Sequence, residues 1–106
     1  MKDDKKIQEM AMLEQNLQSI LFQKQAFEME SDETSAALKE IDSSGDEVFK
    51  IIGQLMIKTE KSKIKSELLE KQKILDLRIK AFDKQENYLR EKLDKIREEL
   101  TASIKK

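Results

Sequence analysis

The fold of this chain is decided by the stretch Val48-Phe49-Lys50-Ile51-Ile52-Gly53-Gln54-Leu55-Met56-Ile57-Lys58. This stretch alone breaks the helical pattern that fills both of its flanks. Its apolar residues stand too close together for the exposed face of a helix, and several are β-branched or aromatic, as strands prefer. Gly53 divides it into two halves and suits a tight turn that requires a positive φ. The stretch predicts a short β-hairpin over residues 47–58.

This hairpin requires partners from other chains. A two-stranded sheet alone is marginal in water and leaves both edges unpaired, and no other stretch of the 106 residues resembles a strand. Both faces are expected to be apolar, with Val48, Ile52 and Met56 on one face and Phe49, Ile51, Leu55 and Ile57 on the other. The residues predicted to form the oligomer interface are Val48, Phe49, Ile51, Ile52, Gly53, Leu55, Met56 and Ile57.

Both flanks of the hairpin carry a sustained 3.5-residue repeat, which is typical of a coiled-coil seam. The first seam runs Met10, Leu13, Leu17, Ile20, Lys24, Phe27, Ser31, Thr34, Leu38 and Ile41. The second runs Leu68, Gln72, Leu75, Ile79, Phe82, Glu86, Leu89, Leu93, Ile96, Leu100 and Ser103. We expect helices over about 5–43 and 63–105 that form an antiparallel coiled coil. The predicted fold is mainly α with one hairpin, in a single domain over residues 1–106.

Polar residues interrupt the first seam at Lys24, Ser31 and Thr34. Two interpretations remain open: ordinary imperfection of the repeat, or polar positions that fix the register and leave room for motion at the cost of stability. Gly45 follows the first helix and suits the left-handed conformation at a helix C-terminus.

An antiparallel seam permits two registers. One places Leu17 beside Leu89, the other places Leu17 beside Ile96, and the sequence does not choose between them. Both registers bring Lys24 and Glu86 into adjacent layers. The sequence therefore predicts a contact between these two charged side chains.

Composition excludes several classes of function. Lys plus Arg number 21 and Asp plus Glu number 22, so no net field attracts nucleic acid or an anionic membrane. No apolar run approaches the ~18 residues that span a bilayer, and the start lacks a signal peptide's apolar core, which favours an intracellular, cytoplasmic protein. The absence of Cys and His removes disulfides, thiolate nucleophiles and the usual zinc ligands. We expect no catalytic residues, no metal and no cofactor.

The connector after the hairpin is rich in lysine, with Lys58, Lys61, Lys63 and Lys65. These side chains allow an alternative function, an RNA- or DNA-binding coiled coil, whose binding would be sensitive to salt. The connector has neither interleaved aromatic residues nor a basic surround, so a solvated connector is the favoured interpretation.

Some apolar residues lie off the seams, where the coiled coil does not need them. Those near the two chain ends are Ile7, Ala11, Met12, Leu21, Phe22 and Ile104, and those on the second helix are Leu69, Ile74, Leu77 and Tyr88. A cluster of exposed apolar residues at the chain ends indicates an adhesive surface, although incidental apolar residues at frayed helix ends explain it too. Methionine adds a side chain that packs against many shapes.

These features resemble the β class of prefoldin subunits, particularly the archaeal form. The resemblance covers nearly the whole length and rests above all on the hairpin stretch, in which an aromatic-lysine pair precedes a glycine and an aliphatic strand that ends in a basic residue. Further support comes from Gln23-Lys24-Gln25, Glu28-Met29, Glu33-Thr34, Ala37-Leu38-Lys39-Glu40-Ile41, Glu67-Leu68, Glu70-Lys71, Leu75-Asp76-Leu77-Arg78 and Lys84-Gln85-Glu86. A single hairpin, where the α class has two, indicates the β class.

The resemblance implies a hexamer of two α-class and four β-class subunits, with the hairpins in an intersubunit β-barrel. It also implies an ATP-independent holdase that captures unfolded or nascent polypeptide at the coiled-coil tips and delivers it to a group II chaperonin. The tip residues expected to bind clients are Ile7, Met10, Met12, Leu13, Leu17, Leu93, Ile96, Leu100 and Ile104. The main alternative is a structural or tethering coiled-coil oligomer with one specific partner.

Overall fold

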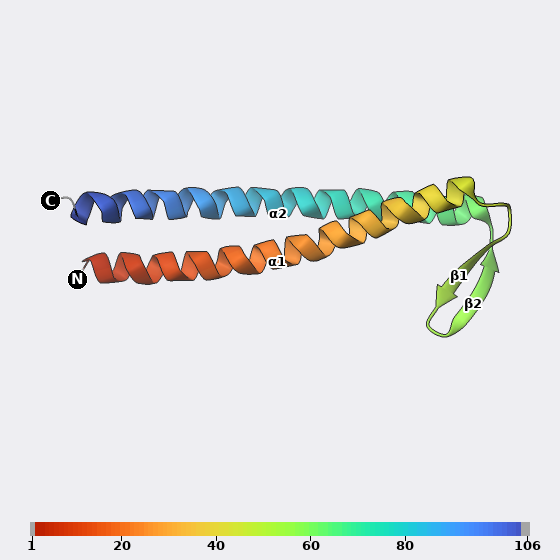
Figure 1. Cartoon of the computed structure of the whole chain (residues 1–106), viewed down its shortest axis with the longest axis horizontal. Coiled ribbons are helices and arrows are strands. Elements are labelled where there is room, and N and C mark those ends of the chain that lie inside the picture. Colours follow the sequence, from red (N-terminus) through yellow and green to blue (C-terminus); the bar gives the residue numbers. More distant parts are fainter. Residues whose placement is uncertain (1, 105–106) are drawn as a thin grey trace. The chain divides into compact units, whose positions relative to one another are not determined.

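The computed structural model describes residues 2–104 of the chain. Helix α1 spans Lys2–Ser43, strand β1 Val48–Ile52, strand β2 Leu55–Thr59 and helix α2 Lys61–Ile104 (Figure 1). The fold is mainly α, with two long helices joined by an antiparallel hairpin, as the sequence predicts. The helix end expected at residue 105 lies outside the described residues.

The described chain divides into two compact units, each built from parts of both helices. The terminal unit consists of residues 2–26 of α1 and residues 79–104 of α2. The hairpin unit consists of residues 27–78, which include the end of α1, both strands and the start of α2.

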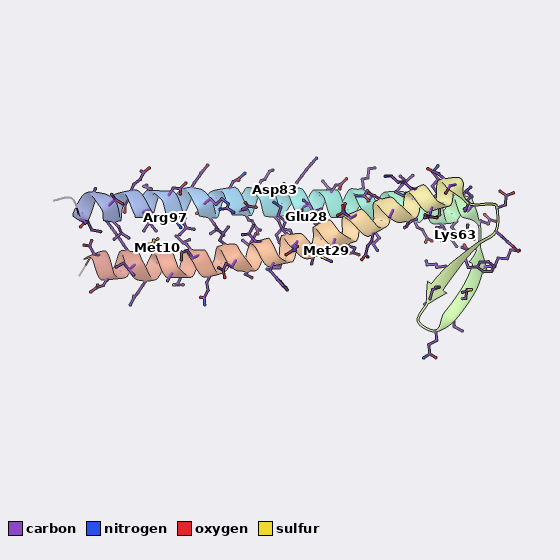
Figure 2. The ribbon with its side chains drawn as sticks, viewed as in Figure 1. Met10, Glu28, Met29, Lys63, Asp83 and Arg97 are labelled. Carbon is purple, nitrogen blue, oxygen red and sulfur yellow. The ribbon has the colours of Figure 1, made fainter. Side chains whose placement is uncertain are left out.

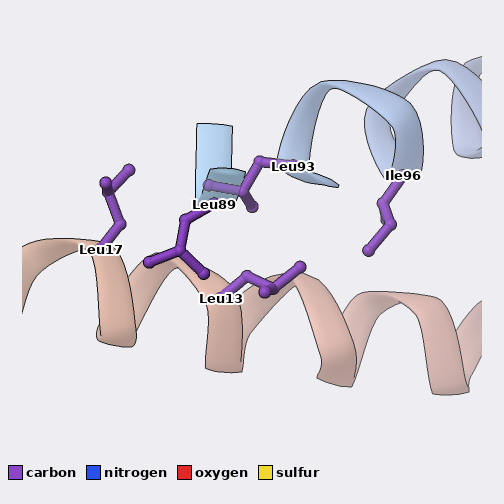
Figure 3. Packing of buried hydrophobic residues seen from close by; sticks show 5 residues of the cluster. All are labelled: Leu13, Leu17, Leu89, Leu93 and Ile96. Atoms are coloured by element: carbon purple, nitrogen blue, oxygen red, sulfur yellow. The ribbon is translucent and has the colours of Figure 1, made fainter. Parts of the chain in front are cut away.

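The core of the terminal unit is a row of aliphatic side chains between the two helices. It consists of Leu13, Leu17, Leu89, Leu93 and Ile96, with Met10, Ile20, Leu21 and Leu100 packed against it (Figure 3). All of these except Leu21 are residues that the sequence places on a seam. Burial stabilises a folded chain by about 1.5–3 kcal/mol for each large aliphatic side chain fully removed from water. This core therefore holds the two helices of the unit together.

The terminal unit adopts the first of the two registers. The hydroxyl of Ser103 donates hydrogen bonds to both carboxylate oxygens of Asp3, at 3.0 and 3.3 Å. At this offset Leu17 lies level with Leu89, whereas the other register would carry Ser103 to the level of Met10. Figure 3 shows the leucines in the corresponding order along the two helices.

The polar seam positions of the hairpin unit are hydrogen-bonded. The amide of Gln72 donates to the Ser31 hydroxyl at 2.6 Å and accepts from the Ser35 hydroxyl at 3.2 Å. Thr34 is only 3% exposed, and its hydroxyl donates to the Glu30 carbonyl at 2.8 Å. Because Gln72 reaches both serines at a single offset of the helices, this layer supports the interpretation that the polar residues fix the register.

The two strands pair antiparallel across the two-residue turn at Gly53 and Gln54. Partners across the ladder are Val48 with Thr59, Phe49 with Lys58, Lys50 with Ile57, Ile51 with Met56 and Ile52 with Leu55. Since ladder partners share a face, Met56 lies with Ile51, and Ile52 lies with Leu55 and Ile57. The predicted division of the faces is wrong, because a two-residue loop pairs odd-numbered with even-numbered positions. Both faces nevertheless carry large apolar residues.

The two glycines have different roles. Gly53 has a φ of 59°, as the sequence predicts, and its place at the first position of the turn matches a type II′ hairpin. Gly45 is not among the positive-φ residues, so the expected left-handed cap is wrong. Side-chain donors instead bind two carbonyls around the end of α1. The Ser44 hydroxyl donates to the Ile41 carbonyl at 2.9 Å, and the Lys61 ammonium donates to the Ser44 carbonyl at the same distance.

This difference predicts opposite outcomes for the same substitution at the two glycines. Gly53→Ala forces a Cβ into the left-handed region and is expected to destabilise the hairpin by about 1–2 kcal/mol. Gly45→Ala is the matched control, since open space surrounds both glycines and only Gly53 has a positive φ. Thermal unfolding checks the pair: equal midpoints for the two variants would contradict the role of the turn.

Candidate interaction surfaces

The predicted oligomer interface is exposed in the single chain. Phe49, Ile51, Ile52, Gly53, Leu55, Met56 and Ile57 are all exposed, and Val48 is half-buried. Ile51 and Met56, which face each other across the ladder, are 69% and 67% exposed. Within residues 2–104 the sheet has two strands and no further partner. Large apolar side chains on both faces of so small a sheet require burial against other chains.

Lysines of the hairpin form ion pairs. Lys50 of β1 pairs with Glu67 of α2, their Nζ and Oε2 atoms 3.1 Å apart. Lys58 of β2 pairs with Glu47, just before β1, at 3.3 Å. The Lys50–Glu67 pair links the hairpin to α2, whereas the Lys58–Glu47 pair lies at the base of the hairpin itself; both pairs are exposed and individually weak.

Most lysine side chains of the connector contact oxygen atoms of their own chain. Besides Lys58, the Lys61 ammonium caps the Ser44 carbonyl, and Lys65 pairs with Asp42 at 2.8 Å. Lys65 lowers the pKa of the Asp42 carboxyl, which keeps this pair charged. Three of the four lysines proposed for nucleic acid thus contact oxygens of their own unit, which weakens that alternative.

The nine residues predicted to bind clients fall into three groups, all in the terminal unit. Leu13, Leu17, Leu93 and Ile96 are buried in the seam, and Met10 and Leu100 are half-buried against it. Ile7, Met12 and Ile104 are exposed, the last two by 64% and 83%. Only the exposed group is accessible while the helices stay paired. The buried group requires the helix ends to separate.

Phe22 is a further exposed apolar residue of the terminal unit, 76% exposed on α1. The sequence places it off the seam and near the chain ends, but it is absent from the predicted client-binding residues. Its exposure follows from the helical period: Leu17, Ile20 and Lys24 occupy the seam around it and turn its side chain outward.

A charged layer crosses the terminal unit beside the aliphatic core. The Lys24 ammonium lies 3.0 Å from an Oε of Glu86, so the predicted contact between these seam charges is confirmed. Asp83 lies closer still, at 2.6 Å, and Arg90 binds Glu86 at 2.8 Å. Asp83 and then Glu86 raise the pKa of Lys24, while Arg90 and then Lys24 lower the pKa of Glu86. Both shifts favour the charged forms of Lys24 and Glu86.

The lowered pKa of Glu86 predicts a pH dependence. A carboxyl with a lower pKa in the folded state stabilises it above the unfolded pKa of about 4.3, and this contribution disappears as pH falls through the folded value. Glu86→Gln is expected to lower the midpoint of thermal unfolding by a few degrees at pH 7 and to match the wild type in acid. Glu91→Gln, on the exposed side of α2, is the control. A Glu86→Gln difference that persists unchanged at pH 3 would contradict the role of this layer.

Residues 2–104 offer neither a cluster of metal ligands nor a membrane-spanning helix. That part of the chain contains no group of three acidic, cysteine or histidine side chains arranged to hold a metal ion. Neither helix, over the same residues, is apolar enough along its length to cross a membrane.

Paired helices with a protruding apolar hairpin define a class of subunit that is completed by other chains. A family model described as "Prefoldin subunit" matches residues 4–106. The chain is 43% identical over 93 residues to the prefoldin subunit beta of Thermococcus kodakarensis, covering 86% of this chain and 76% of that one. It is 34% identical over 98 residues to that of Methanothrix thermoacetophila, covering 91% and 82%.

A solved structure agrees with these relatives. The crystal structure of the prefoldin beta subunit from Thermococcus strain KS-1 matches with a TM-score of 0.91 and 34% identity, covering 96% of this chain and 91% of that chain. The chain belongs to the prefoldin family, as a subunit of the β class. Members of this family are chaperone subunits that form an oligomer with other prefoldin subunits.

Proposed function

We propose that this chain is a β-class subunit of a cytoplasmic, ATP-independent holdase in which two α-class and four β-class subunits form a hexamer. Its hairpin joins those of neighbouring subunits in an intersubunit β-barrel. Its terminal unit captures unfolded or nascent polypeptide, and the complex delivers that polypeptide to a group II chaperonin.

The observation that carries the capture of clients is the exposure of Ile7, Met12 and Ile104 in a member of a chaperone-subunit family. Large apolar side chains in water bind other apolar groups without demanding one shape, and methionine adapts most readily. Several terminal units in one assembly multiply such weak contacts through effective concentration. Assembly is supported separately by the apolar residues on both faces of the hairpin.

The experiment that tests this function has two stages. Native mass spectrometry of the chain alone, and after mixing with an α-class subunit, is expected to yield the hexamer in the mixture. The hexamer is then offered several unrelated denatured proteins without nucleotide, and binding is followed by size-exclusion chromatography. Co-elution with all of them, and their release to an added group II chaperonin, is the expected result. Binding of one partner alone would favour the tethering alternative.

A further inference from the structure

Residues 7–26 of helix α1 have an uncharged outward face. Between Ile7 and Ala26 only Glu9, Glu14 and Lys24 are charged, although 41% of the whole chain is. The part of α2 in the same unit, residues 79–104, carries twelve charged residues. Coiled-coil packing does not explain this contrast, because seam residues alone decide the pairing and both outer faces meet solvent.

Two of the three charged residues turn toward α2. Lys24 binds Asp83 and Glu86, as described above. Glu14 accepts a hydrogen bond from the Arg97 guanidinium at 3.3 Å, and Arg97 is labelled in Figure 2. Neither charge is left on the outward side of α1.

The third charged residue, Glu9, interacts electrostatically with Lys92 of α2. The hydroxyl of Tyr88 and then the Glu9 carboxylate raise the pKa of Lys92. At 100° per residue Glu9 falls beside the seam positions Leu13 and Ile20, so it lies on the flank that approaches α2 and not on the outward face. All three charged residues of this part of α1 interact with the partner helix.

The outward face consists of apolar and amide side chains. Ile7, Met12 and Phe22 are exposed on it, and Gln8, Gln15 and Gln18 stand between them, exposed as well. At 100° per residue these six positions fall within an arc of about 140° on the side opposite the seam. The result is a continuous strip of amide and apolar side chains along the helix.

The amide and apolar side chains of the strip are suited to binding an extended polypeptide. Each glutamine amide both donates and accepts hydrogen bonds, as a peptide group does, and the apolar residues can cover the side chains of the bound segment. No ion has to be dehydrated when the strip is covered, whereas covering the outer side of α2 would bury charges at a high cost. Over residues 7–26 the strip is about 30 Å long, which accommodates about nine residues of extended chain.

We infer that the outward face of α1 from Ile7 to Ala26 is the surface along which an extended, uncharged segment of unfolded polypeptide lies. The inference rests on the proposed holdase function and gives it a location. Clients are held along one side of α1 while the two helices remain paired. Glutamine side chains bind the client backbone, and Met12 and Phe22 contact its apolar residues.

Two matched pairs of variants in the assembled hexamer test this. Gln15→Glu adds one charge to the strip, and Asn87→Asp adds one to the outer side of α2 in the same unit. Phe22→Ser removes an exposed apolar side chain from the strip, and Leu77→Ser removes one of similar exposure from the hairpin unit. Affinity is measured with a fluorescent, permanently unfolded polypeptide without nucleotide. Native mass shows whether each variant is still a hexamer.

We expect Gln15→Glu to weaken binding about fivefold and Phe22→Ser about tenfold, while the two controls bind within a factor of about two of the wild type. Equal affinities for all four variants, with wild-type binding intact, would overturn the inference and leave the holdase function standing. A Phe22→Ser variant that changes the mass of the oligomer and not client binding would also overturn it, since the strip would then be a subunit interface. Failure of the wild type to bind would instead refute the proposed function.

Discussion

Ile57→Lys is expected to prevent assembly of the oligomer. Ile57 shares one face of the hairpin with Ile52 and Leu55. In the proposed hexamer, neighbouring strands cover this face. The substitution removes up to about 1.5–3 kcal/mol of apolar burial and places an ammonium in an apolar interface, which costs several kcal/mol more. The association constant is expected to fall at least roughly a hundredfold. Native mass spectrometry after mixing with the α-class subunit measures this directly.

The control for this prediction is Gln54→Lys, which adds the same charge at the turn of the same hairpin. Gln54 makes no ladder pair and is exposed, so this variant is expected to assemble like the wild type. Circular dichroism of both variants checks that the helices remain. A hexamer formed by Ile57→Lys at wild-type concentrations would show that the hairpin is not the assembly element.

The triple variant Ile7→Ser, Met12→Ser and Ile104→Ser is expected to lose most of its protection of denatured clients. These side chains are exposed, so their removal leaves the aliphatic core intact. If each contributes about 1 kcal/mol by partial burial against a client, their loss weakens binding roughly a hundredfold. The measurement is client affinity of the assembled hexamer, with its native mass as a check.

A matched control exists in the hairpin unit. Leu69, Ile74 and Leu77 are exposed to a similar degree, and the triple serine variant at these positions removes a comparable apolar area. It is expected to protect clients as well as the wild type does. If both triple variants lose protection equally, exposed apolar area in general binds clients, and the terminal unit has no special role.

Most of the fold was predictable because it depends on periodic burial. Two seams and a dense apolar stretch around Gly53 are patterns that few structures satisfy, and the structure buries or half-buries every seam position except Ser103. The contact of Lys24 with Glu86 was predictable for the same reason, since both permitted registers bring these positions together.

The features that were predicted wrongly from the sequence depend on local geometry. The faces of the hairpin were assigned wrongly because the loop length sets which positions pair, and one residue of difference moves every side chain to the other face. Gly45 was expected as a left-handed cap, but the serine hydroxyls and Lys61 satisfy the carbonyls at that helix end. Backbone capping by side chains distant in sequence leaves no periodic signal.

The candidate client surface was predictable only in part. Apolar residues near the chain ends indicated it, but the prediction included the seam residues Leu13 and Leu93, which are buried, together with the off-seam residues Met12 and Ile104, which are exposed. Phe22 was listed among the off-seam residues near the chain ends but was not included in the predicted client surface. The lack of charge around it is a stronger signal, and the printed sequence already contains it.

The most direct test of the proposed function is light scattering by a chemically denatured protein diluted into buffer that contains the hexamer and no nucleotide. An equimolar amount of hexamer is expected to suppress scattering almost completely for several unrelated clients, and adding ATP is expected to change nothing. Scattering equal to that of the client alone, or suppression that requires ATP, would contradict the proposed function.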